Sequence, residues 1–81
     1  MIRMYVRQAV DDFETWRRAH AAKAAERAAR GVTGEGFHRG LDDPGEVTYW
    51  HDFATPDAAR TYDSIEQGER GSKIVWFGHA I

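Results

Sequence analysis

The chain has no cysteine, a single leucine and no long apolar run. The absence of cysteine excludes disulfides and thiolate metal ligands. No stretch approaches the roughly 20 apolar residues of a membrane span, and the amino-terminal residues lack the apolar run of a secretory signal. The charges are mixed, with 11 basic and 13 acidic residues, and make no basic surface for nucleic acid. We therefore expect a soluble, cytoplasmic protein that binds neither membranes nor nucleic acid.

Alanine and aromatic rings dominate the apolar residues that are present. Alanine supplies 12 and aromatic residues supply 10 of the 34 hydrophobic side chains in this 81-residue sequence. We expect one domain, residues 1–81, and a domain of this size buries only roughly 60–65% of its extended surface. Small cores of this kind usually need a disulfide, a metal or a second subunit. Because cysteine is absent, oligomerisation is the favoured source of extra stability.

The amino-terminal half predicts a strand followed by a helix. Residues 2–10 alternate between apolar and polar side chains, as a half-buried strand does. Asp11 with Glu14 three residues later resembles a capping box at a helix start. The alanine-rich run that follows has high helix propensity up to Arg30, and Gly31 is placed to end it.

The carboxy-terminal half predicts a hairpin, a helix and a last strand. The predicted elements are a strand at 34–41, a turn at 42–45, a strand at 47–53, a helix at 57–66 and a strand at 73–81. Thr55 and Pro56 cap this second helix, and Gly68 and Gly71 end it. The whole order predicts an α+β, ferredoxin-like βαββαβ fold: a four-stranded antiparallel sheet of order 4-1-3-2 with two helices on one face.

Two helices on one side leave the other face of the sheet uncovered. If Phe53 points toward the helices, the two-residue repeat points Trp50 away from them, with Tyr5 on the same side and Phe37 beside it across the hairpin. Exposed apolar surface of this kind favours a homodimer formed by two sheets. The alternative is a surface tryptophan that is shielded by a nearby arginine, Arg3 or Arg39.

The segment from Gly31 to Arg60, GVTGEGFHRGLDDPGEVTYWHDFATPDAAR, resembles the small dimeric α+β barrel proteins. More particularly, it is similar to the antibiotic-biosynthesis-monooxygenase-like members that are often labelled "cyclase". The matching positions mark turns and caps: Gly31 and Val32, Asp42 to Pro44, Asp52 and Phe53, and Asp57 to Ala59. The resemblance implies a homodimer with a hydrophobic cleft between each sheet and its helices. The family's chemistry includes cofactor-free oxygenation of aromatic polyketides, ring closure, isomerisation and haem degradation, and no family catalytic residue is carried over here.

The hairpin also predicts a candidate site. With the turn at 42–45, His38 lies opposite Tyr49, His51 shares their helix-facing side, and Gly36 leaves space opposite His51. Imidazole can move protons near neutral pH, so His38 and His51 are the predicted acid–base pair, with Tyr49 as hydrogen-bond donor to a developing oxyanion. A register slip of one residue would send His38 to the other face. The predicted substrate-binding residues are His20, Trp16, Phe13, Gly36 and Trp76.

Three functions are compatible with these residues. The first is a cofactor-independent cyclase, isomerase or monooxygenase that acts on a small hydrophobic, aromatic or polyketide-like substrate; no cofactor or metal is expected. The second is a non-catalytic ligand-binding or interaction protein of the same fold, in which each histidine has a structural role. The third is haem or metal binding, with His20, His38 and His51 as a three-nitrogen set. His79 lies on the last strand, too far across the sheet to join them.

Overall fold

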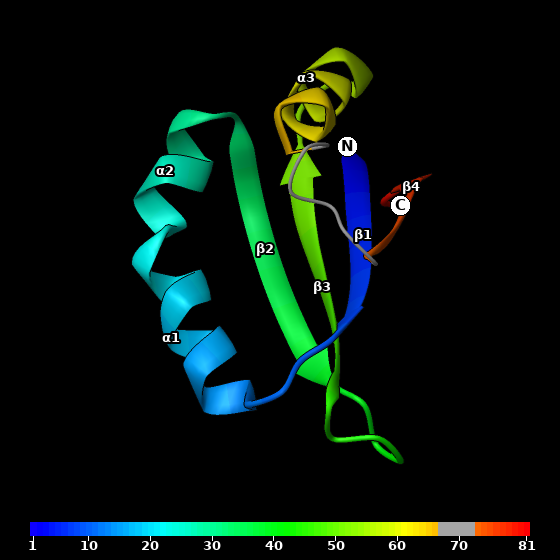
Figure 1. Ribbon diagram of the computed structural model, residues 1–81. Helices are drawn as coiled ribbons and strands as arrows, with labels where there is room; N and C mark the ends of the chain where they lie inside the picture. Colours follow the sequence, from blue (N-terminus) through cyan, green and yellow to red (C-terminus); the bar gives the residue numbers. More distant parts are fainter. Residues whose placement is uncertain (67–72) are drawn as a thin grey trace.

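The computed structural model describes residues 1–66 and 73–81. Its elements are β1 (Ile2–Ala9), α1 (Phe13–Ala22), α2 (Ala24–Ala29), β2 (Val32–Arg39), β3 (Glu46–Phe53), α3 (Pro56–Glu66) and β4 (Ile74–His79). The four strands form one antiparallel sheet of order β2-β3-β1-β4, which confirms the predicted order (Figure 1). Gly68 and Gly71, the predicted helix breakers, lie outside the described residues.

The region predicted as one long helix forms two helices. α1 ends at Ala22, and Lys23 leaves helical geometry with φ −103° and ψ 12° before α2 begins. The predicted cap at Asp11 is wrong, because Asp12 is the N-cap and its carboxylate accepts hydrogen bonds from the Thr15 N–H and hydroxyl. Asp12 stands three residues before Thr15, the spacing at which a side chain reaches a free helix amide.

The core lies between the sheet and the helices. Phe53 and Val47 of β3 are fully buried, and their side of the sheet continues through β1. The other buried hydrophobic residues are Ile2, Met4, Val6, Tyr49, Ala59 and Tyr62. Because alternate residues of a strand share a face, this pattern also places His51 on the helix-facing side.

The opposite side, called the outer face here, carries three aromatic residues in register. Tyr5 pairs with Trp50 on β3 and with Trp76 on β4, and it stacks on Trp76 with ring centroids 5.2 Å apart. This confirms that Tyr5 and Trp50 point away from the helices. Arg3 lies over the Trp50 ring and Arg7 over the Trp76 ring, so the arginine shielding considered for Trp50 is also present. The prediction that Trp76 lines the cleft is wrong, because its pairing with Tyr5 places it on the outer face.

The hairpin is shifted by one residue from its predicted register. Phe37 pairs with Tyr49, Gly36 with Trp50 and His38 with Thr48. The connection is longer than the predicted turn: the Gly40 N–H donates to the Glu46 carbonyl at 2.8 Å, so residues 41–45 all lie in the loop. The strand therefore spans 32–39 and not 34–41, and the faces of its side chains are exchanged.

Two glycines accommodate this register. A Cβ at Gly36 would lie less than 3.0 Å from atoms of the Trp50 indole, which crosses it on the outer face. A Cβ at Gly40 would lie 2.5 Å from the Asp43 carbonyl oxygen, where the loop folds back on the strand. Both close approaches require a residue without a side chain.

Candidate functional site

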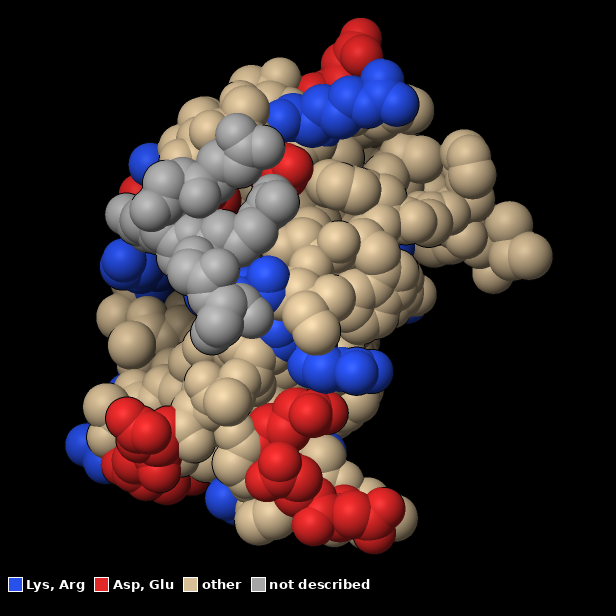
Figure 2. All heavy atoms as spheres, turned by 45° about the vertical axis from the view of Figure 1, so that its right-hand side comes forward, with Lys and Arg blue, Asp and Glu red and all other residues tan. Residues whose placement is uncertain are grey.

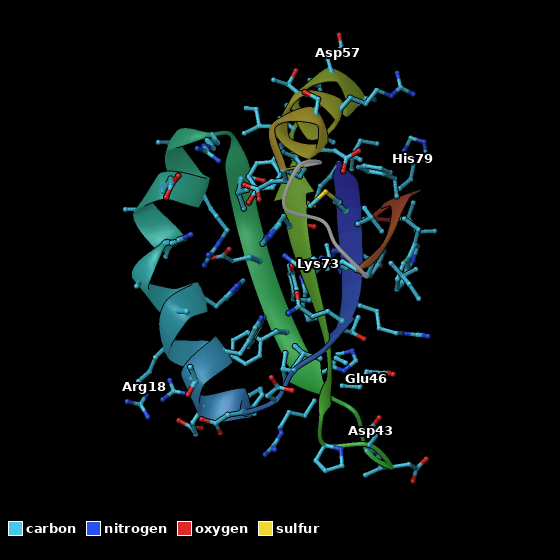
Figure 3. All side chains as sticks on the ribbon, in the orientation of Figure 1. Arg18, Asp43, Glu46, Asp57, Lys73 and His79 are labelled. Atoms are coloured by element: carbon cyan, nitrogen blue, oxygen red, sulfur yellow. The ribbon has the colours of Figure 1, made fainter. Side chains whose placement is uncertain are left out.

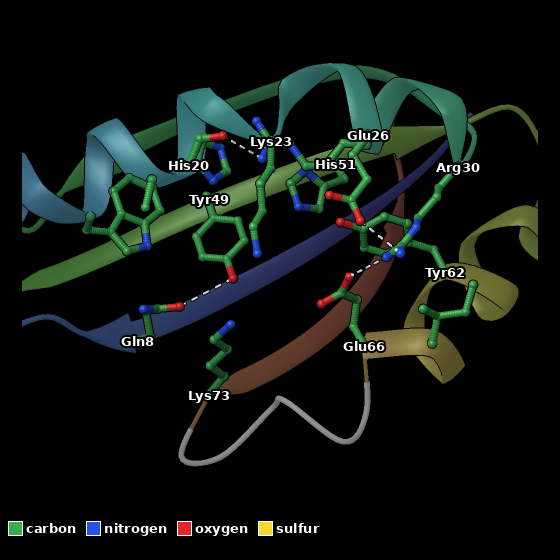
Figure 4. Close-up of a pocket in the computed structure, with 14 residues that line it drawn as sticks. Gln8, His20, Lys23, Glu26, Arg30, Tyr49, His51, Tyr62, Glu66 and Lys73 are labelled. Atoms are coloured by element: carbon green, nitrogen blue, oxygen red, sulfur yellow. Dashed lines mark hydrogen bonds and ion pairs between the residues drawn. The ribbon is translucent and has the colours of Figure 1, made fainter.

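A cavity of about 330 Å³ opens between the sheet and the helices (Figure 4). Its walls come from α1, α2, β1, β3, α3 and the residue just before β4. No residue of α1 is buried, so this helix stands off the sheet and leaves room beneath it. The space that the resemblance implies between sheet and helices is therefore present.

Aromatic rings and imidazoles form one wall of the cavity. The His20 and His51 rings are nearly parallel, at 9°, with centroids 6.0 Å apart. Tyr49 lies 5.4 Å from each of these two rings, and Trp16 stacks on His20 at 4.7 Å. Tyr62 of α3 closes the far side of His51 at 5.4 Å. The structure thus brings together His20, His51, Tyr49 and Trp16 from the predicted set.

Other predicted site residues lie elsewhere. His38, expected beside Tyr49, is on the outer face near Trp50, because the register differs by one residue. For the same reason Gly36 lies under Trp50 and does not leave space beside His51. Phe37 was expected on the outer face and instead packs under α1, 5.2 Å from Trp16.

Phe13 supports this aromatic wall from the end of α1. It contacts Trp16 and Phe37 at ring distances of 6.0 and 6.1 Å. It is not among the residues that line the cavity. Phe13 therefore holds Trp16 in position and does not itself face the cavity.

Burial sets the protonation of both cavity imidazoles. His51 is only 3% exposed, and burial lowers its pKa from 6.5 to about 4, with the positive charge of Arg27 acting in the same direction. Burial and Arg27 likewise lower the pKa of His20 to about 4. Both rings are therefore neutral at pH 7. The Nδ1 atom of His51 lies 3.5 Å from the Glu35 carboxylate and has no hydrogen-bond partner among the described residues.

The two tyrosines remain protonated hydrogen-bond donors. Burial raises the pKa of Tyr49 well above its usual value, and its hydroxyl donates to the Gln8 side-chain oxygen at 3.3 Å. Burial, with Glu66 acting in the same direction, raises the pKa of Tyr62 to about 12. A phenol that stays protonated can stabilise an oxyanion by donating a hydrogen bond to it.

A buried arginine holds α2 against the sheet beside these rings. Arg27 donates to both oxygens of Glu35, at 2.5 and 3.0 Å, and to the His20 carbonyl at 2.7 Å. Arg27 is 7% exposed and the Glu35 side chain is 28% exposed, so the guanidinium is shielded from water and the carboxylate is only partly shielded. Arg27 and Glu35 are not among the site residues predicted from the sequence. The sequence contains one indication that Arg27 belongs to the site. It lies seven residues after His20, so the two side chains share one face of the predicted helix.

Charged side chains form the other side of the cavity. Arg30 pairs with Glu26 at 2.9 Å and with Glu66 at 3.1 Å, which links α2 to α3. Lys23 and Lys73 also line the cavity, and neither makes an ion pair with any residue that the structure describes. The cleft is therefore more polar than the hydrophobic cleft that the resemblance implies.

The three-histidine metal set is not assembled. His38 lies on the outer face, away from His20 and His51. Among residues 1–66 and 73–81, no group of three or more histidine, aspartate or glutamate side chains is placed to hold a metal ion. Within the same residues, no helix has the length and apolar character needed to cross a membrane.

Comparison with solved structures identifies the fold. A protein described as a "putative antibiotic biosynthesis monooxygenase" from Bordetella bronchiseptica superposes with a TM-score of 0.72 at 18% identity, over 99% of this chain and 96% of that one. A protein of the same description from Deinococcus radiodurans gives 0.63 at 12% identity, over 100% and 93%. A dimeric ferredoxin-like protein from an uncultured marine organism gives 0.65 at 9% identity, over 95% and 90%. No family model and no curated protein matches the sequence. The resemblance is thus confirmed for the fold.

Proposed function

We propose that this protein is a cofactor-independent enzyme that enolises or deprotonates a small, flat, oxygenated substrate in the cavity. The observation that carries the proposal is His51: a buried, neutral imidazole beside Tyr49, with Nδ1 facing Glu35. With the proton on Nδ1, the lone pair of Nε2 is free to act as a base. The monooxygenase-like descriptions of proteins with this fold support the same class of reaction.

The proposed step is a proton transfer. His51 removes a proton from a carbon next to a carbonyl, the C–H electron pair moves into the new C=C bond, and the carbonyl oxygen becomes an enolate. Tyr49 exchanges its hydrogen bond to Gln8 for one to this oxyanion. Return of the proton to another carbon isomerises the substrate, and attack of the enolate carbon on a second carbonyl closes a ring. With dioxygen as the oxidant, the enolate carbon of an aromatic or polyketide-like molecule forms a C–O bond and becomes a hydroperoxide; loss of water from it leaves a second carbonyl on the substrate.

A second candidate is a ligand-binding protein without turnover. The low pKa values of His20 and His51 favour it, because an imidazole with a pKa of about 4 is a weak base. In that case the rings would serve as hydrogen-bond acceptors and as a stacking surface for the ligand. Both candidates use the same cavity and differ only in proton transfer.

Deuterium exchange separates the two candidates. The probe is 2-tetralone, an enolisable aromatic ketone, in D₂O without added cofactor, and proton NMR follows the loss of its C1 hydrogens. An enzyme accelerates this exchange, and His51→Gln removes the acceleration while circular dichroism shows a folded protein. His38→Gln is the control, because His38 lies on the outer face. Binding of 2-tetralone without faster exchange would instead support the ligand-binding function.

We also propose that the outer face forms a homodimer. Trp50 and the Tyr5–Trp76 stack lie on it, and Trp76 is 38% exposed although it is a large apolar ring. Figure 2 shows mainly uncharged side chains across the middle of the side of the molecule that includes β4, with acidic side chains toward the hairpin end. A two-fold contact between two sheets would cover these rings. We also propose that the protein is located in the cytoplasm.

Sedimentation velocity tests the dimer. The wild-type chain should sediment as a dimer at micromolar concentration, and Trp50→Ser should shift it toward the monomer. Leu41→Ser is the matched control, since Leu41 is 98% exposed in the hairpin loop and belongs to none of the four strands that form this face. A wild-type monomer that is stably folded would overturn the proposed assembly.

A further inference from the structure

The two lysines of this chain line the same cavity. Among 11 basic residues only Lys23 and Lys73 are lysines, and they stand 50 positions apart in the sequence. Lys23 joins α1 to α2, and Lys73 immediately precedes β4. The fold nevertheless brings both to one opening (Figure 4). In Figure 4 their side chains reach from opposite sides toward the region of the Tyr49 hydroxyl and Gln8.

The other charges around the cavity are already paired. Arg27 is held by Glu35, and Arg30 is held by both Glu26 and Glu66. Four basic residues line the cavity (Lys23, Arg27, Arg30 and Lys73) against two acidic ones (Glu26 and Glu66), although the whole chain carries a net charge of −2. The excess of positive charge at this opening is therefore local, and the two lysines supply it.

We propose that Lys23 and Lys73 together bind a carboxylate of the substrate, so that the cavity takes a flat aromatic or enolic acid in preference to a neutral molecule. This inference rests on the proposed function and names its substrate class. An ammonium group offers three hydrogen-bond donors and a full charge, which suits an anionic oxygen. The rings of Trp16, His20 and Tyr49 then contact the flat part of the substrate.

Binding of such an anion would also change the chemistry of the site. The charges of Arg27 and Lys73 both act to keep the pKa of His20 low, after the larger effect of burial, and Glu35 opposes them. A carboxylate between the lysines would offset the positive charge and make the imidazole a stronger base. This effect concerns His20, the imidazole on which Lys73 acts, and not His51.

Two probes of the same shape test the charge requirement. The probes are 2-naphthoate, which is anionic, and 2-naphthamide, which is neutral, each titrated into the ¹⁵N-labelled full chain and followed by amide chemical shifts. Wild-type protein should bind 2-naphthoate more tightly, and added NaCl should weaken only this probe. Each lysine-to-methionine change should weaken 2-naphthoate about fivefold, and K23M/K73M about 20-fold, as expected for partly exposed charges. Affinity for 2-naphthamide should not change.

Matched variants make the result specific. Lys23→Arg with Lys73→Arg keeps the charge and should keep the preference for the anion. Arg18→Met removes one positive charge from α1 on the side that faces away from the cavity and should leave both affinities unchanged (Figure 3). Equal affinity of the wild type for the two probes, failure to bind either probe, or an equal loss in Arg18→Met would overturn the inference.

The tests of the carboxylate site and of the proposed enzyme fail independently. If K23M/K73M binds 2-naphthoate like the wild type while His51→Gln abolishes exchange of 2-tetralone, the proposed enzyme is supported and the carboxylate site is refuted. If the affinity for 2-naphthoate depends on the lysines but the protein does not accelerate deuterium exchange of 2-tetralone, the carboxylate site is supported as part of a ligand-binding protein.

Discussion

Lowering the pH from 7 to 5 is expected to destabilise the folded protein through His51. The pKa of this imidazole is 6.5 when exposed to water and about 4 in the fold, because it is buried beside the positive charge of Arg27. Between these values the unfolded chain binds a proton that the folded chain excludes. The free energy of unfolding therefore falls as the pH drops through this interval, and it is at its full value above pH 6.5.

The size of the effect follows from the two pKa values. Each pH unit of difference corresponds to about 1.4 kcal/mol, so the whole interval is worth about 3 kcal/mol, of which about 2 kcal/mol is lost between pH 7 and pH 5. His20 has a similarly low pKa but is only half-buried, so its contribution is smaller. Against the 5–15 kcal/mol that stabilises typical domains, this loss is large. Glu35 should add little to the loss between pH 7 and pH 5. The hydrogen bond from Arg27 lowers the pKa of that carboxyl from its usual 4.5, which is already below this interval.

Urea unfolding at pH 7, 6 and 5, followed by tryptophan fluorescence at one protein concentration, measures this loss. Wild-type protein should lose about 2 kcal/mol more than His51→Gln over this range. His38→Gln removes a histidine from the outer face and keeps both cavity imidazoles, so it should lose as much as the wild type. Equal pH dependence in wild type and His51→Gln would show that His51 is not held neutral by burial.

Three further substitutions test the packing that positions the site. Arg27→Met should lower the free energy of unfolding in urea by about 3 kcal/mol, because Glu35 would be left partly buried without its partner; no change would mean that the pair is solvated. Gly36→Ala should displace the Trp50 indole and shift its fluorescence, since the new methyl group would overlap the ring, and an unchanged spectrum would contradict the close approach. Phe53→Ala should cost about 3–5 kcal/mol in thermal unfolding, and a loss below 1 kcal/mol would contradict its full burial.

The fold could be predicted because its main signals are local. The alternation in 2–9 and 46–53 gives two strands with one buried face each, and the structure has both. Gly31 ends the helical region with a φ of 103°, a conformation that glycine adopts readily. Such signals depend on neighbouring residues in the chain, so the order of elements and the sheet topology follow from them.

The polar half of the cavity could not be predicted in this way. Lys73 and Glu66 reach it only because the fold brings the end of α3 and the residue before β4 to the cavity, and nothing in their local sequence indicates that meeting. The break at Lys23 lies inside a run of strong helix formers, so propensity alone predicts one continuous helix. Contacts between distant segments set both features.

The hairpin shows why the site is harder to predict than the fold. Either loop length joins the same two strands, so the topology does not depend on it, whereas each added loop residue exchanges the two faces of the strand. The five-residue loop places Phe37 beneath α1, where it contacts Trp16 and His20, and leaves His38 on the outer face. The four-residue turn would bury His38 and remove the phenylalanine from its ring contacts with Trp16 and His20. The ring contacts of Phe37 beneath α1, together with the close fit of Trp50 over Gly36, therefore account for which histidines can act together in the cavity.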